Sequence, residues 1–344
     1  MAFVMQKAYA REHQGEDIMV DHDSRKSGPK DMQAILDEMK QMLGQGAFDS
    51  KEAVQQAVHA HMNAVNQRPL DDFHGLSSAQ LHHVLYNPFD APELLTLCEG
   101  ISERPVAMVT ALFEVIAEEA KGAGIKLTPK GNLPRSVVAM AGAAIQEQGL
   151  KPESYIGRVR NEEDFEALHV TRLIAELGHL ARKNRGRLLL VQATQRRLDR
   201  GDWSGIYRDL LQTYCHGFNW GYRDGYPAVP IIQQGCFFSL YLLARHGATW
   251  RPASFYADAF LRAFPMALAE IPLDRSTRVE PEEDFRRVWE LRSVHRFAEF
   301  FGLVELRPDP EPPTTVSPYL ESWQVRKAAV LGQVVQWKVL PPDD

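Results

Sequence analysis

The stretch EEDFEALHVTRLIAELGHLARKNRGRLLLVQA, Glu162–Ala193, predicts a helix followed by a β-hairpin. Its acidic opening suits a helix N-terminus, where the helix dipole favours negative charge. We expect the helix to end near Leu177, because a glycine follows it. HLARK and RLLLVQA are then typical of two strands, with Asn184, Arg185 and Gly186 at the tip between them.

A similar order of elements recurs along the chain, around residues 105–145, 162–200 and 285–337. In the first recurrence, Leu127-Thr128-Pro129-Lys130-Gly131 predicts a strand end and a turn, and Pro134 then opens a helix. The second recurrence has Thr194 where the turn glycine would stand. We therefore expect a different turn geometry there.

Basic residues gather on the predicted hairpins, although the 344-residue chain carries a formal net charge of −6. That balance argues against a protein that coats nucleic acid with its whole surface. The candidate phosphate contacts are Arg182, Lys183, Arg185 and Arg187 on the middle hairpin, and Lys126 and Lys130 in the first recurrence. Arginine side chains on a hairpin tip suit phosphate oxygens, although a solvated hairpin carries such residues too.

The overall composition is that of a globular protein with a sizeable core, since 44% of the residues are hydrophobic and 24% charged. Cys98, Cys215 and Cys236 are scattered, which is typical of a reducing compartment. The longest apolar run, residues 235–244, is shorter than the roughly 20 residues that span a bilayer. We therefore expect a cytoplasmic protein of bacterial type that has no membrane partner.

The predicted fold class is mainly α with short β-hairpins, in a multi-helical arrangement. The expected parts are a flexible N-terminal arm at residues 1–29, a helical domain at 30–150 that ends in a hairpin unit, and a larger helical domain at 151–344 with hairpins at about 179–193 and 302–327. The arm is polar and shows no apolar face.

Several residues mark the ends of helices. Ser77 and Gln80 form a predicted capping box, and Asn87 followed by a proline is expected to end that helix. Pro105 stands where a first-turn proline belongs, and Asp202 is a predicted N-cap.

Side chains that could carry chemistry are present but poorly spaced for it. Five histidines, His59, His61, His74, His82 and His83, fall within 25 positions. Metal ligands on a helix need spacings of three or four, and two pairs of these histidines diverge on a helix instead. We therefore expect no metal and no cofactor, and we assign no catalytic residue, although a hydrolase-like enzyme that uses this region stays open.

The segment around Phe218, Trp220, Tyr222 and Tyr226 is rich in aromatic residues and glycines. It could present a stacking surface for bases or a ligand. Such a run more often packs onto a protein core, and we expect that here.

The order helix, strand, basic tip and strand is the plan of a winged helix, in which a two-stranded wing can lie along DNA phosphates. Three stretches, RPLDDFHGLSSAQLHHVLYNPFD, KLTPKGNLPRSVV and FAEFFGLVEL, resemble blocks of a group of uncharacterised bacterial proteins. The resemblance implies a mainly α protein with winged-helix-like units and an unknown function. It carries no catalytic residue over.

The leading functional expectation is a non-enzymatic binding protein that contacts nucleic acid through its basic hairpin. The alternative is a protein–protein interaction scaffold built from the same units. Nothing in the sequence indicates an oligomeric state.

Overall fold

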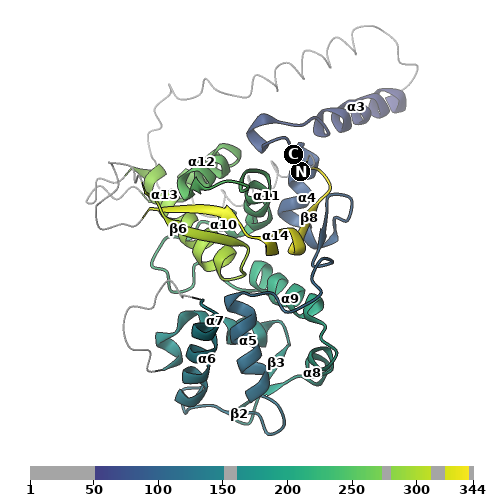
Figure 1. The fold of residues 1–344 in the computed structure, drawn as a ribbon. Helices are drawn as coiled ribbons and strands as arrows, with labels where there is room; N and C mark the ends of the chain where they lie inside the picture. Colours follow the sequence, from purple (N-terminus) through teal and green to yellow (C-terminus); the bar gives the residue numbers. More distant parts are fainter. Residues whose placement is uncertain (1–50, 151–160, 273–279, 311–321, 341–344) are drawn as a thin grey trace, which may run out of the picture. The chain divides into compact units, whose positions relative to one another are not determined.

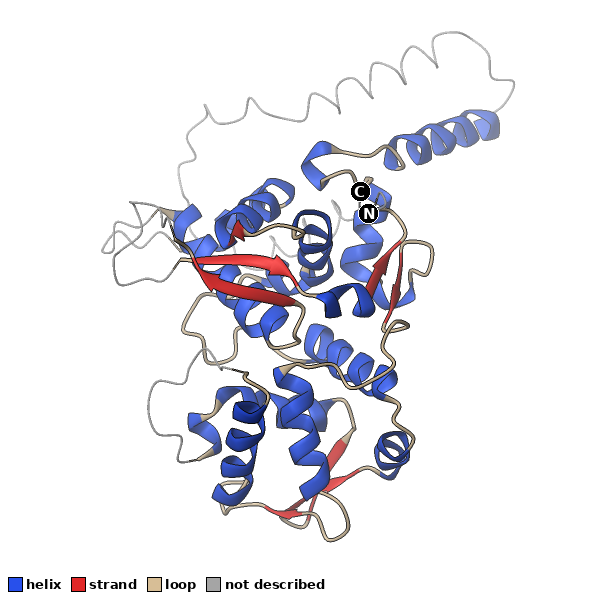
Figure 2. Cartoon of the chain, viewed as in Figure 1, coloured by secondary structure: helices blue, strands red, loops and turns tan. Residues whose placement is uncertain are grey.

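The computed structural model describes residues 51–150, 161–272, 280–310 and 322–340. Within these ranges the chain is mainly α with short antiparallel strands, which confirms the predicted fold class (Figure 2). The chain forms two compact units that divide between Val65 and Asn66. The first unit is described through α3 (Lys51–Asn66), which ends at this division. The expected N-terminal arm, residues 1–29, lies outside the described residues.

One part of the second unit is a group of helices on a three-stranded sheet, drawn in blue to teal in Figure 1. Its elements in chain order are α5 (Met108–Glu119), β2 (Ile125–Lys126), α6 (Arg135–Glu147), a 3₁₀ turn (Glu162–Asp164), α7 (Glu166–Leu177), β3 (Ala181–Asn184), β4 (Arg187–Leu190) and α8 (Gln192–Asp199). The strand order is β2-β4-β3, and both pairings are antiparallel.

A second three-stranded sheet lies in the C-terminal part, which Figure 1 draws in green to yellow. Its elements are α10 (Pro230–Gln234), α11 (Cys236–His246), β5 (Arg251–Pro252), α12 (Ala253–Ala263), a 3₁₀ turn (Pro265–Glu270), α13 (Pro281–Trp289), a π-helix (Glu290–Glu299), β6 (Val304–Pro308), β7 (Trp323–Lys327) and α14 (Ala329–Val334). The strand order is β5-β7-β6.

The remaining elements join these two parts. They are 3₁₀ turns at Asp71–Phe73 and Pro88–Asp90, α4 (Ser78–Tyr86), β1 (Leu95–Leu97), α9 (Trp203–Gln212), a short π-helix (Thr213–Gly217) and β8 (Val335–Trp337). β1 pairs with β8, so the last described strand returns to the first.

The predicted caps of two helices are confirmed. The Ser77 hydroxyl accepts from the Gln80 amide at 3.2 Å, and the Gln80 side chain accepts from the Ser77 amide at 2.9 Å. Asn87 then ends α4. At the start of α9, the Asp202 carboxylate accepts from the Gly205 amide at 2.9 Å. These local signals act within one helical turn, which is why they can be read from sequence.

The expected role of Pro105 is wrong, because α5 begins only at Met108. The Thr110 hydroxyl donates to the Pro105 carbonyl at 2.6 Å and to the Ala107 carbonyl at 3.0 Å. Ala107, the N-cap, has an extended backbone. The Thr110 hydroxyl therefore occupies the Pro105 carbonyl, which would accept a backbone hydrogen bond if the helix began earlier.

Two turn predictions also differ from the structure. Leu127–Gly131 does not end a wing strand but connects β2 to α6, with Gly131 in the left-handed region at φ +81°. After β4 the chain enters α8 at once, and Thr194 is buried within that helix. No turn glycine is needed there, so the mismatch at this threonine has no structural consequence.

The expected division at about 150 adjoins residues 151–160, which lie outside the described residues. Segments on its two sides share one sheet, since Ile125 pairs with Leu188 and Lys126 pairs with Arg187. The recurrences expected around 105–145 and 162–200 therefore form one structural group.

The core of the C-terminal part surrounds α11, where every residue from Cys236 to Leu243 is buried. The aromatic segment packs onto this core region in part: Phe218 and Trp220 are buried as expected, whereas Tyr226 is 38% exposed. The Trp220 indole donates to the Tyr214 carbonyl at 2.9 Å. A buried indole generally needs such an acceptor, so this bond holds the segment in place.

Candidate nucleic-acid interface

The sheet β2-β4-β3 carries most of the predicted contacts. Lys126 lies opposite Arg187, and Arg182 lies opposite Leu189. Directly paired residues project to one face of a sheet, and so do alternate residues along a strand. The face opposite the fully buried Leu188, which we call the outer face, therefore holds these four side chains.

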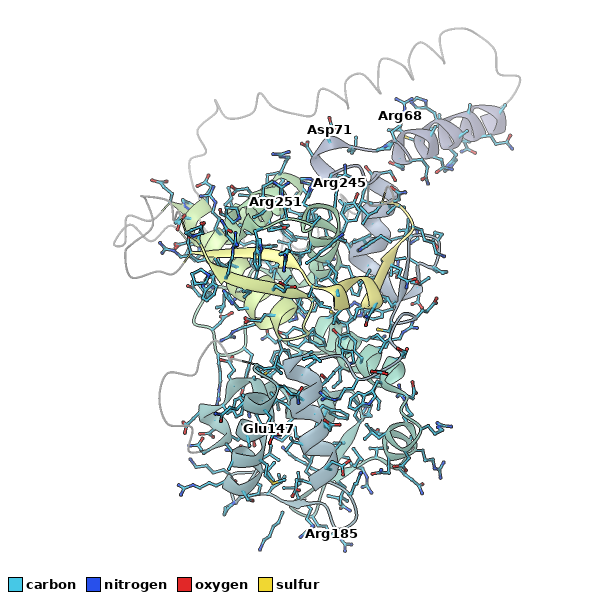
Figure 3. All side chains as sticks on the ribbon, viewed as in Figure 1. Arg68, Asp71, Glu147, Arg185, Arg245 and Arg251 are labelled. Atoms are coloured by element: carbon cyan, nitrogen blue, oxygen red, sulfur yellow. The ribbon has the colours of Figure 1, made fainter. Side chains whose placement is uncertain are left out.

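The hairpin tip is a two-residue turn that presents an arginine. Asn184 pairs with Arg187, and Arg185 and Gly186 between them have φ values of +47° and +73°. Positive φ at both central positions defines a type I′ turn, which favours asparagine followed by glycine. An L-residue in the left-handed region costs roughly 1–2 kcal/mol, yet arginine occupies it here. Its side chain lies at the end of the hairpin (Figure 3).

Arg187 is partly exposed and holds the sheet together. Its guanidinium donates to the Ala123 carbonyl and, at 2.7 Å, to the Gly124 carbonyl. Gly124 has φ +71°, and a side chain on it would approach the Leu188 carbonyl to 2.5 Å. The arginine and the glycine together bring β2 against β4. Arg187 is therefore a structural residue within this surface.

Lys183 also has an internal partner. It pairs with Leu188, which places it on the face opposite Arg182. Its ammonium lies 3.3 Å from the Glu176 carboxylate of α7. The Lys183 side chain remains 45% exposed, but this ion pair reduces its contribution to a basic surface.

Five of the six predicted contacts are exposed, and Lys183 is one of them. Because Lys183 is paired with Glu176, four exposed contacts remain without an acidic partner: Lys126, Lys130, Arg182 and Arg185. We call them the basic surface. Lys126 and Arg182 lie on the outer face, Arg185 is at the tip, and Lys130 is in the connection after β2. Among the described residues, none of the four has an ion pair with an acidic side chain.

The helix before the hairpin, α7, is enclosed by the rest of the protein. Glu166 at its start forms an ion pair with Arg296 at 2.8 Å. Near its end, a side chain at Gly178 would come within 2.5 Å of the Thr213 hydroxyl, so the two segments are in close contact. This enclosure was not visible in the sequence.

A buried polar cluster anchors the start of α7. The Glu162 carboxylate is fully buried and accepts from Arg172 Nε at 2.5 Å and from the Leu133 amide. It also lies 2.7 Å from His169 Nδ1, while His169 Nε2 lies 3.1 Å from the Tyr222 hydroxyl. Burial alone raises the pKa of the Glu162 carboxyl, but these hydrogen bonds and the Arg172 charge bring that pKa below its usual value.

Sequence reasoning missed this cluster, and the spacing in α7 could have indicated it. His169, Arg172 and Glu176 are separated by three and four residues, so they share one side of the helix. Such a row is usually taken as a solvated face. Here the Arg172 guanidinium binds both Glu162 and Glu176, and it is almost completely buried.

The C-terminal hairpin, expected at 302–327, is formed by β6 and β7. Its proline-rich connection, residues 311–321, lies outside the described residues. The Arg307 and Arg326 guanidinium carbons lie 4.4 and 4.7 Å from the centroid of the Trp250 ring. Arg326 also forms an ion pair with Glu305. Both arginines of this hairpin therefore have a partner within the protein.

The predicted histidine region is divided between different elements. His74 Nδ1 lies 3.3 Å from His246 Nε2, and burial lowers the pKa of both imidazoles, that of His246 to about 4. His82 and His83 lie on α4. Within the described ranges no three His, Cys, Asp or Glu side chains gather as a metal site would require. The same ranges contain no helix with the length and apolar character to cross a membrane.

In comparisons with known proteins, a family model described as the Y4jL N-terminal domain matches residues 104–201. None of the curated proteins and none of the solved structures compared matches the chain. The match covers α5 to α8 and therefore the whole basic surface.

Proposed function

We propose that the protein is a non-enzymatic nucleic-acid-binding protein, in which residues 104–201 work as a winged-helix module. In this proposal the hairpin β3–β4 is the wing, and the basic surface contacts the phosphate backbone. Two observations support the assignment of the module. The elements follow the order helix, strand, helix, helix, strand, strand, and the strand order in the sheet is β2-β4-β3. The setting we propose is the cytoplasm of a bacterium, which the three free, buried cysteines suit.

The observation that carries the proposal is the basic surface itself. Four cationic side chains stand on one hairpin, its neighbouring strand and the connection after that strand, in a chain whose net charge is negative. Exposed Lys and Arg donors that have no acidic partner are suited to phosphate contacts. Arg185 adds a further argument, because it keeps a strained backbone position that asparagine would fill at lower cost.

Salt dependence of binding tests the proposal. The slope of log affinity against log salt is about 0.9 for each phosphate contact, so four contacts predict a loss of roughly 150-fold between 50 and 200 mM salt. With Arg182→Ala and Arg185→Ala together, the loss over the same range falls to roughly 12-fold. Affinity at 50 mM salt should also drop at least about tenfold. Fluorescence anisotropy of a labelled 20-base-pair duplex, with the full-length protein, measures both quantities.

Arg68→Ala with Arg262→Ala is the matched control, because it removes the same charge from two exposed arginines outside residues 104–201. This pair should leave the salt slope unchanged. Absence of binding at 50 mM salt would refute the proposal, and so would an equal loss in the two double variants.

A protein-interaction scaffold is the second candidate. Met140 on α6 and Leu177 on α7 are 43% and 51% exposed, which is high for apolar side chains of a folded module. Replacing both with glutamine should leave duplex affinity unchanged in the first proposal. Capture of a partner protein that depends on these two residues would favour the scaffold.

A further inference from the structure

The elements α5 to α8 have counterparts, in the same order, in the C-terminal part. A helix, a short strand, two further helices, a hairpin and a closing helix occur at residues 108–199 and again at 236–334. We call these ranges the first and the second repeat. In both, the first strand pairs with the last, which lies in the middle of the sheet: β2-β4-β3 and β5-β7-β6. A shared strand order across separate segments is a strong sign of one topology used twice.

The hydrogen bonds at the end of the third helix match bond for bond. In the first repeat the Leu180 amide donates to the Ala175 carbonyl at 2.9 Å, and in the second the Leu303 amide donates to the Ala298 carbonyl at 2.7 Å. The preceding bonds, Gly178 to Ile174 and His179 to Glu176, correspond to Phe301 to Phe297 and Gly302 to Glu299. Each repeat therefore closes its third helix with the same cap.

The hairpins are attached in the same way. Ala181 pairs with Leu190 in the first repeat, and Val304 pairs with Lys327 in the second. The next residue after each hairpin donates back to the cap at 3.0 Å, from Val191 to the Leu180 carbonyl and from Ala328 to the Leu303 carbonyl. The sequence Glu-Glu-Asp-Phe also stands at the start of both third helices, at residues 162–165 and 282–285.

This register shows which charges the two repeats share. Arg182 corresponds to Glu305, and Lys126 corresponds to Pro252. The arginines of the second sheet, Arg307 and Arg326, are bonded to Gln324 and Glu305 and stack on Trp250. The hairpin arginines of the second repeat therefore have partners on their own sheet and on Trp250, unlike Arg182 and Arg185.

The third helices of the two repeats are joined to each other. Glu166 on α7 pairs with Arg296 on the π-helix that continues α13. Tyr222 lies between them, with its hydroxyl 3.1 Å from His169 and its carbonyl accepting from Arg296 at 2.9 Å. The buried ion pair between Arg292 and Asp224 holds the same segment.

Neither third helix presents a row of fully exposed side chains. From Glu166 to Leu177 the one exposed residue is Leu177, and from Pro281 to Glu299 it is Glu282. A helix that reads bases must enter the major groove and present several side chains to base edges. Both helices are enclosed too tightly for that.

We infer that the fold unit is present twice, and that the joining of the two third helices confines nucleic-acid contact to the wing of the first repeat. The ligand class is then double-stranded nucleic acid, bound through its phosphates without regard to base sequence. A duplex fits better than a single strand, because the basic surface and the adjoining Leu189 offer no aromatic ring for base stacking. This inference rests on the proposed function.

The test is a selection from a randomised duplex pool by the full-length protein, with affinities measured for two unrelated duplexes and a single strand of equal length. We expect no enriched motif, twofold or smaller differences between the duplexes, and weaker binding of the single strand. Arg182→Ala with Arg185→Ala should weaken binding to both duplexes at least tenfold. Leu177→Gln should leave both affinities within twofold, since α7 stays outside the groove.

The outcomes separate the two proposals. An enriched motif, a tenfold preference between the duplexes, a loss of binding in Leu177→Gln, or tighter binding of the single strand would overturn this inference and leave nucleic-acid binding intact. Failure to bind any of the three nucleic acids would refute the proposed function itself.

Discussion

Replacing Glu162 with glutamine should destabilise the first repeat strongly, because this carboxylate is fully buried among three donors. Glutamine keeps one accepting oxygen, but its amide group then faces the Arg172 or His169 donor. A hydrogen bond to a charged group contributes about 1.5–3 kcal/mol, and breaking a buried ion pair costs about 3–5 kcal/mol. Arg172 keeps Glu176 as a second partner, so we expect a loss of stability of about 3 kcal/mol, the lower limit for breaking a buried ion pair.

A loss of about 3 kcal/mol raises the unfolding equilibrium constant roughly 150-fold. With a denaturant slope of about 3 kcal/mol per molar, the urea midpoint would fall by about 1 M. Urea unfolding followed by tryptophan fluorescence measures this shift. Glu163→Gln is the matched control, since Glu163 is exposed and its carboxylate accepts from the Asn132 side chain at 3.0 Å. It should change the free energy of unfolding by less than about 0.5 kcal/mol.

The destabilisation caused by Glu162→Gln should also depend on pH, and it should be smaller at low pH. The pKa of the Glu162 carboxyl is depressed in the folded protein, so its stabilisation is present above the unfolded pKa of about 4.3. It is lost as the pH falls through the folded pKa. The difference between the native protein and Glu162→Gln should therefore shrink below about pH 4. A difference at pH 7 below about 1 kcal/mol, or one equal to that of Glu163→Gln, would refute the reasoning.

Three further changes test individual residues. Arg187→Ala removes the donor to two carbonyls and should lower the free energy of unfolding by about 1–2 kcal/mol, against less than about 0.5 kcal/mol for Arg182→Ala; equal urea midpoints would contradict the structural role. Arg185→Asn should raise thermal stability by about 0.5 kcal/mol, because asparagine tolerates positive φ, while it weakens duplex binding; a fall in both would contradict the turn assignment. Burial raises the pKa of the Cys98 thiol to about 12, so iodoacetamide at pH 8 should label it about a thousandfold more slowly than a free thiol; fast labelling detected by mass spectrometry in the native protein would oppose this.

Local signals in the sequence predicted the local structure. The Ser77 and Asp202 caps and the hairpin tip at Arg185 and Gly186 each depend on residues within a few positions of one another. The pairing of β2 with β4 joins positions about 60 residues apart and leaves no such mark. For this reason the first two recurrences could not be recognised as one sheet from sequence alone.

The candidate site was predicted in part. The exposed positions of Arg182 and Arg185 follow from their place on a hairpin. The hydrogen bonds of Arg187 to two backbone carbonyls could not be predicted, because they depend on where β2 lies. The burial of α7 depends on contacts with Tyr222 and Arg296, far along the chain. Polar spacing on that helix places His169, Arg172 and Glu176 on one side but does not show whether that side is buried, because a buried network and a solvated face have the same periodicity.

His179 and Gly302 occupy the same left-handed position at the end of the two third helices, with φ +55° and +70°. At Gly302 a side chain would approach the Val106 carbonyl to 2.8 Å and the Ala107 side chain to 2.9 Å. His179 already carries a side chain and is exposed. Positions 179 and 302 thus have the same backbone geometry, but there is space for a side chain at 179 and not at 302. Over evolutionary time we expect descendants of this protein to vary at 179, where asparagine or glycine fits equally well, and to keep glycine at 302.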